Sequence, residues 1–336
     1  MLRAIVFAVD LEPDEQVCGP HDPWTGTQRA REELRPLRLR LEQATGAPVQ
    51  FNWFVRLDPQ IEKTWGRPDW VAMACPDLLR EIRASGDFTG MHVHTWKWHP
   101  RRETWFNDFA DAAWRAHCLK TSAEAYHAMF GKAPVASRFG HRALGPEDVA
   151  VLKRLGVRYD LTLEPGAPSH RLSSDPLAIS PLPDHLRAPR APYQPSPHDY
   201  LTPAKEEQKS GFWMVPISVT PRPHWCPMRR WPFGVSKHLP MNLVLYPRRI
   251  WENLAAELAG EPGEPSARAP LVMVLRSGDL ARPRFRANFR WVMDRLCVHP
   301  GLRRCRFVGV DRAIEQFPQT HAHAATAGPF GQHRHV

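Results

Sequence analysis

Four side chains at the ends of two apolar segments have the types and spacing of a metal site. Residues 5–9 are apolar and lead into Asp10 and Glu12, and the segment 88–95 contains His92 and His94. If both segments are extended, alternate residues point to the same side, so each pair projects from one face of its strand. Imidazoles and carboxylates are ligands that zinc accepts in catalytic sites. The sequence therefore predicts a divalent metal site, and the alternative is a pair of structural histidines.

Other polar residues follow or interrupt further apolar runs. They are Arg138 and His141 after residues 135–137, Asp160 within 157–163, and Arg276 and Asp279 after 271–275. In barrels of parallel strands, catalytic residues gather at the carboxyl ends of the strands. We therefore expect these residues near a cleft. The alternative for Asp160 and Asp279 is a helix cap or a pairing with an arginine, which is the commoner use of aspartate at such boundaries.

The hydrophobic pattern alternates between short β-rich runs and amphipathic segments. Strands are expected at 5–12, 49–56, 88–95, 135–142, 157–163, 212–219, 270–276 and 305–310. Helices are expected at 27–43, 69–85, 103–130, 248–259, 282–297 and 311–316, and from Pro146 onward. This alternation predicts a parallel sheet, and one α/β barrel is ordinary for a chain of this length.

Two stretches break this pattern. Residues 164–210 include ten prolines between Pro165 and Pro203, which excludes a helix or a central strand there. Long segments of this kind are usually functional or disordered, and the tyrosines Tyr193 and Tyr200 favour a packed insertion over the barrel mouth. Residues 318–336 are rich in histidine and lack periodicity, which predicts a disordered tail. The barrel domain is expected to span residues 1–317.

Composition limits the classes of function. The 336 residues carry a net charge of +10, but the arginines are spread along the chain. Charge is therefore the only observation that supports nucleic-acid binding through residues 222–249. No stretch approaches the ~18 apolar residues of a membrane span. The six cysteines have no CxxC spacing, and the apolar start is too short for a signal peptide. We expect a cytoplasmic protein with free thiols, no nucleic-acid partner and no membrane span.

With the strands placed, the chain resembles the polysaccharide deacetylase family, the NodB-like group of carbohydrate esterases and amide hydrolases. The resemblance spans residues 4–317 and rests on four motifs in the family's order. They are Val9-Asp10-Leu-Glu12-Pro13, the segment from Gly86 to His94 with Asp87 and Phe88 in place of the family's His and Glu, Ser137-Arg138-Phe-Gly140, and Leu275-Arg276-Ser-Gly-Asp279.

The resemblance implies a distorted (β/α)7 TIM-like barrel of the glycoside hydrolase/deacetylase type. It also implies a divalent metal, most often zinc, held by one carboxylate and two histidines, with a second carboxylate that deprotonates a metal-activated water. Asp10 matches the family's base, and Glu12 and His92 match metal ligands. Arg138 matches the arginine that orients the base.

The sequence departs from the family's pattern in its histidines. The second metal histidine normally follows the first by four residues, and Trp96 has that position here, so His94 or His99 must replace it. The family's final histidine, which acts as a general acid, is replaced by Arg276. A guanidinium can stabilise an oxyanion, but it does not donate a proton near neutral pH.

Two functions of different classes follow. The first is a metal-dependent hydrolase of a non-peptide C–N bond, which removes an N-acetyl group from a carbohydrate. The second is a catalytically impaired relative that binds a glycan or an anionic sugar. Both would use aromatic side chains against a sugar ring, although most tryptophans are simply part of a core. The candidates are Trp53, Trp96, Trp98 and Trp225.

Overall fold

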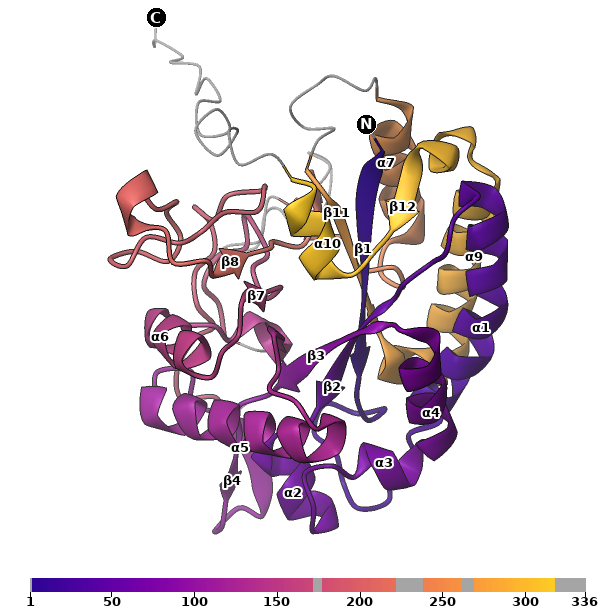
Figure 1. The fold of residues 1–336 in the computed structure, drawn as a ribbon. Helices are drawn as coiled ribbons and strands as arrows, with labels where there is room; N and C mark the ends of the chain where they lie inside the picture. Colours follow the sequence, from indigo (N-terminus) through magenta and orange to yellow (C-terminus); the bar gives the residue numbers. More distant parts are fainter. Residues whose placement is uncertain (1, 172–176, 222–237, 261–268, 318–336) are drawn as a thin grey trace, which may run out of the picture.

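The computed structural model describes residues 2–171, 177–221, 238–260 and 269–317, and a parallel sheet forms its centre (Figure 1). Seven strands follow one another in the order β11-β1-β2-β3-β6-β7-β8, and every pairing on this path is parallel. This arrangement confirms the expected α/β class and its distorted (β/α)7 barrel. The strands are β1 (Arg3–Leu11), β2 (Asn52–Arg56), β3 (Phe88–Val93), β6 (Ala136–Phe139), β7 (Tyr159–Asp160), β8 (Trp213–Met214) and β11 (Leu271–Arg276), with β12 (Cys305–Phe307) on the first residues of β1.

Helices lie outside the strands (Figure 1). In α1 (Thr25–Thr45), Leu34, Leu37 and Leu41 recur on one face and are buried. Burying a leucine contributes about 1.5–3 kcal/mol, so this face fixes the helix against the barrel. The other main helices are α4 (Pro76–Ser85), α5 (Ala112–Phe130), α6 (Pro146–Arg154), α7 (Pro247–Ala259), α9 (Pro283–Val298) and α10 (Val310–Glu315).

The barrel closes irregularly between β8 and β11. In the described part of the chain, backbone hydrogen bonds replace a regular strand pairing here: Ser218 donates to Val272 over 3.0 Å, and Val274 donates to Met241 over 3.0 Å. A short antiparallel ribbon of β9 (Val219–Pro221) and β10 (His238–Pro240) lies beside this junction. The closure is therefore made by loop backbone, which accounts for the distortion.

The helix predicted over residues 103–130 is wrong at its start. It begins at Ala112, and the preceding residues form an antiparallel hairpin of β4 (Trp96–His99) and β5 (Thr104–Asn107). Aromatic residues favour strands, and Trp98 packs edge-on against Trp105 across the hairpin, with the ring centroids 5.1 Å apart. Cross-strand contacts of this kind outweigh the helical pattern.

The predicted helix over 69–85 is also divided. It consists of α3 (Val71–Ala74) and α4, and Pro76 opens the second piece. Proline has no backbone N–H to continue the first helix, so it begins a new one. A further helix, α2 (Pro59–Trp65), was not expected from the sequence.

The proline-rich segment 164–210 connects β7 to β8 with only one short 3-10 helix, Glu206–Gln208, among its described residues. The buried Arg142 ties the segment to the barrel by donating to the carbonyl oxygens of residues 167, 168 and 183, at 3.3, 2.6 and 3.0 Å. The first half of the segment therefore packs near the carboxyl end of β6. Its position over the barrel mouth stays a prediction, and the tail 318–336 lies outside the described residues.

None of the helices that the structure describes combines the length and the apolar character needed to cross a bilayer. The cysteines of the described ranges are all free thiols, as expected from their spacing.

Candidate metal centre

Strand register brings the predicted site residues to one level of the barrel. Asp10 on β1 is paired in register with Arg276 on β11, and His92 on β3 is paired with Arg56 on β2 and Arg138 on β6. These positions are at the carboxyl ends of their strands. Parallel strands in register therefore place the side chains together at one edge of the barrel, where a catalytic site is expected.

Glu12, His92 and His94 form the group among the described residues that could hold a metal ion. Glu12 Oε2 lies 3.1 Å from His94 Nε2 and 3.7 Å from His92 Nε2, and the two Nε2 atoms are 3.0 Å apart. Zinc bonds of about 2.0–2.2 Å in a tetrahedral arrangement separate the donor atoms by roughly 3.3 Å. The three donor atoms therefore fit one small divalent cation.

His94, and not His99, is the second imidazole of this group. His94 follows the end of β3 and its side chain is 2% exposed. His99 ends β4 and packs its ring against Phe106, with the centroids 5.7 Å apart. The hairpin carries His99 away from β3, so positions 92 and 94 provide the two imidazoles of this group.

Two guanidinium groups hold Glu12. Arg276 donates through Nε to Glu12 Oε1, and Arg56 Nη1 lies 3.4 Å from Glu12 Oε2. Burial alone would raise the pKa of Glu12, but the charge of Arg276 and contacts with the two imidazoles outweigh it and hold this pKa well below its usual value. Burial and the charge of Arg56 lower the pKa of His94. The glutamate is therefore ionised and His94 is neutral, which is the state a metal ligand needs.

Asp10 is a second buried carboxylate beside the group. Arg138 donates through Nε to both of its oxygens, at 2.8 and 3.0 Å. His92 Nδ1 lies 3.6 Å from Asp10 Oδ1, on the side of the ring away from the proposed ligand atom. The geometry therefore separates the two carboxylates: Glu12 faces both imidazoles, and Asp10 is oriented by an arginine.

The charges in direct contact at the centre sum to one net negative charge when the histidines are neutral. A cation is therefore electrostatically favoured, even though guanidinium groups approach Glu12 from two sides. The contributing groups are the carboxylates of Asp10, Glu12, Asp58 and Asp279 and the guanidiniums of Arg56, Arg138 and Arg276.

Arg56 and Asp58 are site residues that the sequence analysis missed. Both are fully buried, and Arg56 Nε donates to Asp58 Oδ2 over 2.8 Å. Asp58 also accepts from the backbone N–H of His94 over 3.0 Å. The available signal was a charged residue at the end of the apolar run 49–55, the same signal that identified Arg138 and Arg276.

Asp279 takes the pairing with an arginine that was considered for it, whereas Asp160 takes neither alternative: its hydrogen-bond partners among the described residues are Ser137 and Thr162. Asp279 pairs with Arg276 over 3.1 Å. Asp160 accepts from the Ser137 hydroxyl over 2.6 Å and from the Thr162 N–H over 2.9 Å, and burial raises its pKa to about 6. Both therefore support neighbouring residues.

The rings of His141 and Trp96 pack beside His94, His141 against both of the other two. The ring centroids of His141 and His94 are 4.9 Å apart, and those of His141 and Trp96 are 5.5 Å apart, with the rings edge-on in both pairs. His141 Nε2 also bonds to Gln16 Oε1 over 2.9 Å. Burial lowers the pKa of His141 to about 3, so this ring is neutral near the centre.

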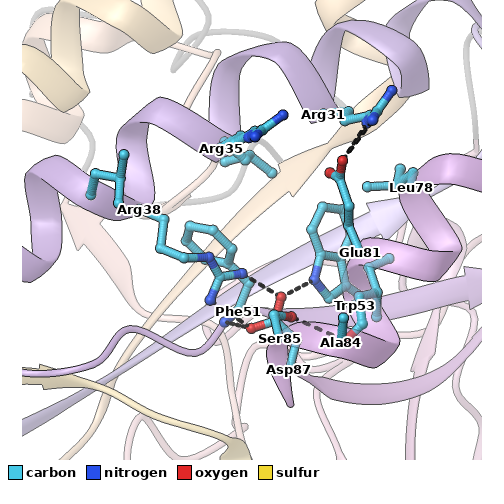
Figure 2. Close-up of a pocket in the computed structure, with 13 residues that line it drawn as sticks. Arg31, Arg35, Arg38, Phe51, Trp53, Leu78, Glu81, Ala84, Ser85 and Asp87 are labelled. Atoms are coloured by element: carbon cyan, nitrogen blue, oxygen red, sulfur yellow. Dashed lines mark hydrogen bonds and ion pairs between the residues drawn. The ribbon is translucent and has the colours of Figure 1, made fainter.

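The tryptophans predicted as sugar-stacking surfaces are not all at the centre. Trp98 is half-buried on the hairpin, where Lys63 Nζ lies 5.3 Å from the centroid of its ring. Trp225 lies outside the described residues. Trp53 points away from the centre, because residues of β2 alternate and Arg56 takes the inward side. Its indole donates to Asp87 over 2.8 Å between α1 and α4 (Figure 2), so a stacking role for Trp53 does not fit.

Gly140 gives a direct test of the position of His94. A Cβ atom at residue 140 would overlap the imidazole of His94, so we expect Gly140→Ala to displace this ring and weaken zinc binding by about 10- to 100-fold, as outer-shell changes do. Competition with a fluorescent zinc chelator measures the affinity. Gly19→Ala is the matched control, because a Cβ there meets nothing within 4 Å. Equal zinc affinities in the two variants would contradict the assignment of His94.

Among the comparisons with known proteins, the likeness to one solved structure, an allantoinase, supports the fold. No family model matches the sequence, and no curated protein matches it. Among solved structures, PuuE allantoinase aligns over 95% of this chain and 91% of its own, at 13% identity and a TM-score of 0.50. A probable polysaccharide deacetylase from Pseudomonas aeruginosa PAO1 aligns over 95% and 92%, at 14% identity and a TM-score of 0.49. A GH57 branching enzyme from Thermococcus kodakaraensis aligns over 95% and 72%, at 13% identity and a TM-score of 0.49.

At 13% identity, the likeness to the allantoinase shows the fold alone. Because one fold can host several chemistries, this likeness bears on the barrel only. The reaction has to be inferred from the residues at the edge of the barrel.

Proposed function

We propose that the chain is a metal-dependent hydrolase that cleaves a non-peptide C–N bond, removing the N-acetyl group of a carbohydrate. The observation that carries the proposal is the convergence of Glu12, His92 and His94 within 4.8 Å of one another, beside a second carboxylate held by Arg138. An ionised carboxylate and a neutral imidazole match the ligand preferences of zinc. The barrel is of a type on which a polysaccharide deacetylase and an allantoinase are also built.

Glu12, His92 and His94 would hold the cation, and Asp10 is the proposed base. A bound divalent cation polarises the acyl oxygen and makes a water molecule more acidic. Asp10 accepts the proton of the attacking water in this proposal, and Arg138 fixes the carboxylate by donating to both of its oxygens. A base that is already oriented needs no reorganisation as the proton moves.

Arg276 has the position of an electrostatic stabiliser. Its Nε and Nη1 atoms bond to Glu12 and Asp279, whereas its Nη2 atom is buried and has no hydrogen-bond partner among the described residues. A fixed N–H donor of this kind stabilises the negative charge that develops on an acyl oxygen. Because a guanidinium keeps its proton, the proton that the leaving nitrogen needs must come from another group.

The same residue favours a second candidate function. Arg276 and Arg56 both contact Glu12, so the carboxylate is partly neutralised without any metal. A protein with this arrangement could bind a glycan or an anionic sugar without hydrolysing it, although Trp96 is 1% exposed and offers no free ring face for stacking. Metal content and acetate release distinguish the two functions.

We expect purified protein, after supplementation with zinc, to retain about one equivalent of the metal, as a three-ligand catalytic site does. Metal is measured by inductively coupled plasma mass spectrometry after gel filtration, and acetate is measured after incubation with N-acetylglucosamine, its oligomers and nucleotide-linked N-acetyl sugars. Dialysis against a chelator should abolish acetate release, and zinc should restore it. Metal-free protein after supplementation would refute the hydrolase proposal, and metal-bound protein with glycan binding but no acetate release would favour the second function.

A further inference from the structure

A groove of about 490 Å³ lies between α1 and α4, outside the barrel (Figure 2). Its volume is within the range of small-molecule sites, about 300–1,000 Å³. The floor is provided by the outward-facing side of β2 and the residues just before it. The lining of the groove is mostly apolar and includes the charged residues Arg31, Arg35, Arg38, Glu81 and Asp87.

One end of the groove is an anion site that the protein fills with its own carboxylate. Asp87 is buried and accepts from Arg38 at 3.0 and 2.5 Å, from the Trp53 indole at 2.8 Å and from the Phe51 N–H at 3.1 Å. The Arg38 guanidinium also lies 4.6 Å from the centroid of the Phe51 ring. Figure 2 shows these donors converging on Asp87. The groove thus combines arginine and aromatic side chains in an arrangement that holds a carboxylate.

The middle of the groove contains a further arginine, Arg35, which no carboxylate of the described residues pairs with. Arg31 is engaged by Glu81 across the groove, at 2.6 Å. Arg35 lies between Arg31 and Arg38 on α1 (Figure 2), and it makes no hydrogen bond or ion pair with the described part of the chain, although its charge acts on Glu81. Arg35 is therefore available to an external anion.

Charge and polarity define the class of ligand. Three arginines and two carboxylates line the groove, so its lining carries one net positive charge, and most of the other lining residues are apolar. Leu39, at 66% exposure, extends the apolar rim toward solvent. A ligand that matches this surface has one anionic group and an apolar body of about the size of an aromatic ring.

We propose that this groove binds a small amphipathic anion, a carboxylate or phosphate attached to an apolar body, with Arg35 as its charged contact. The groove is separate from the candidate metal centre. Asp87 precedes β3 and His92 is near its carboxyl end, five residues and about 17 Å farther along an extended strand. The ligand of the groove is therefore a different molecule from the substrate of the centre.

Titration calorimetry with benzoate and phenyl phosphate tests the proposal, and benzyl alcohol and inorganic phosphate serve as probes that lack the charge or the apolar body. We expect at least one amphipathic anion to bind at a single site with a dissociation constant below about 1 mM. The two control probes should bind at least about 10-fold more weakly. Preference between benzoate and phenyl phosphate identifies the anionic group. Absence of saturable binding of both anions up to ~10 mM, or equal binding of benzyl alcohol, would refute the proposal.

Arg35→Gln tests whether the anion binds in this groove, because the substitution removes no hydrogen bond or ion pair within the described residues. It should weaken binding of the anion by about 10-fold or more, the usual effect of losing a charge-assisted hydrogen bond. Arg29→Gln is the matched control, since Arg29 is on the same helix, pairs with Glu32 and does not line the groove. If both variants bind as the unmodified protein does, the anion is bound elsewhere and the proposal is wrong.

Discussion

Asp10→Asn protein is expected to retain its zinc and to release acetate about 100- to 10,000-fold more slowly than the unmodified protein. The amide has the shape of the carboxylate but does not accept a proton, and removal of a general base usually costs a factor of this size. Metal should remain, because Glu12, His92 and His94 provide the three converging donor atoms without Asp10. The variant thus distinguishes the proposed role of Asp10 as a base from a role as a metal ligand.

Glu12→Gln is the matched substitution at the other carboxylate. It removes a ligand charge of the proposed site and should lower both zinc content and activity, whereas Asp10→Asn should lower activity alone. Zinc is measured per protein chain by mass spectrometry, and the rate is measured at saturating zinc. If Asp10→Asn loses the metal and Glu12→Gln keeps it, the roles of the two carboxylates are reversed. If neither variant changes the metal content, the three-ligand site is wrong.

The sequence was informative about this centre because strand geometry has a fixed period. Residues 92 and 94 must share a face in any extended segment, and the carboxyl ends of parallel strands meet at one edge of a barrel. From the sequence alone, these two rules predict that Glu12, His92 and His94 lie close together. The position of Arg138 beside Asp10 was expected only from the resemblance to the polysaccharide deacetylase family, in which Arg138 matches the arginine that orients the base.

Properties that depend on tertiary contacts could not be predicted from the sequence in the same way. The face on which Trp53 lies depends on the register of β2, and an error of one residue in a strand moves a side chain to the other face. The hairpin β4–β5 was missed because its pairing joins residues 96–99 with 104–107, and local helix periodicity does not report cross-strand contacts. The choice between His94 and His99 likewise required the hairpin, which carries His99 away.

Arg56 and Asp58 connect the candidate metal centre to neighbouring elements of the fold. Asp58 caps α2, accepting from the N–H groups of Gln60 and Ile61 at 3.0 and 3.4 Å. It also accepts from the N–H of His94, and Arg56 connects it to Glu12. One buried ion pair thus joins the start of α2, the backbone of His94 just after β3, and the carboxylate of Glu12. We therefore expect this ion pair to be important because it positions its neighbours, more than because of the free energy of its own electrostatic attraction.

Arg56→Met is therefore expected to destabilise the protein by about 3–5 kcal/mol, the usual cost of removing one partner of a buried ion pair. The side chain of Arg56 is 0% exposed and those of Glu12 and Asp58 are 1% and 0% exposed, so both carboxylates would remain buried with less compensation. Urea unfolding of metal-free protein, followed by circular dichroism, measures the change without a contribution from zinc binding.

Arg67→Met is the matched control for this substitution, because Arg67 and Asp69 have the same two-residue spacing as Arg56 and Asp58. The Arg67 side chain is 47% exposed, and exposed ion pairs contribute little, so its unfolding midpoint should remain close to that of the unmodified protein. Similar midpoints for the two variants would mean that Arg56 is replaceable. The buried pair would then not be what holds Glu12 and His94 in place, and the ligand geometry would have to come from strand register alone.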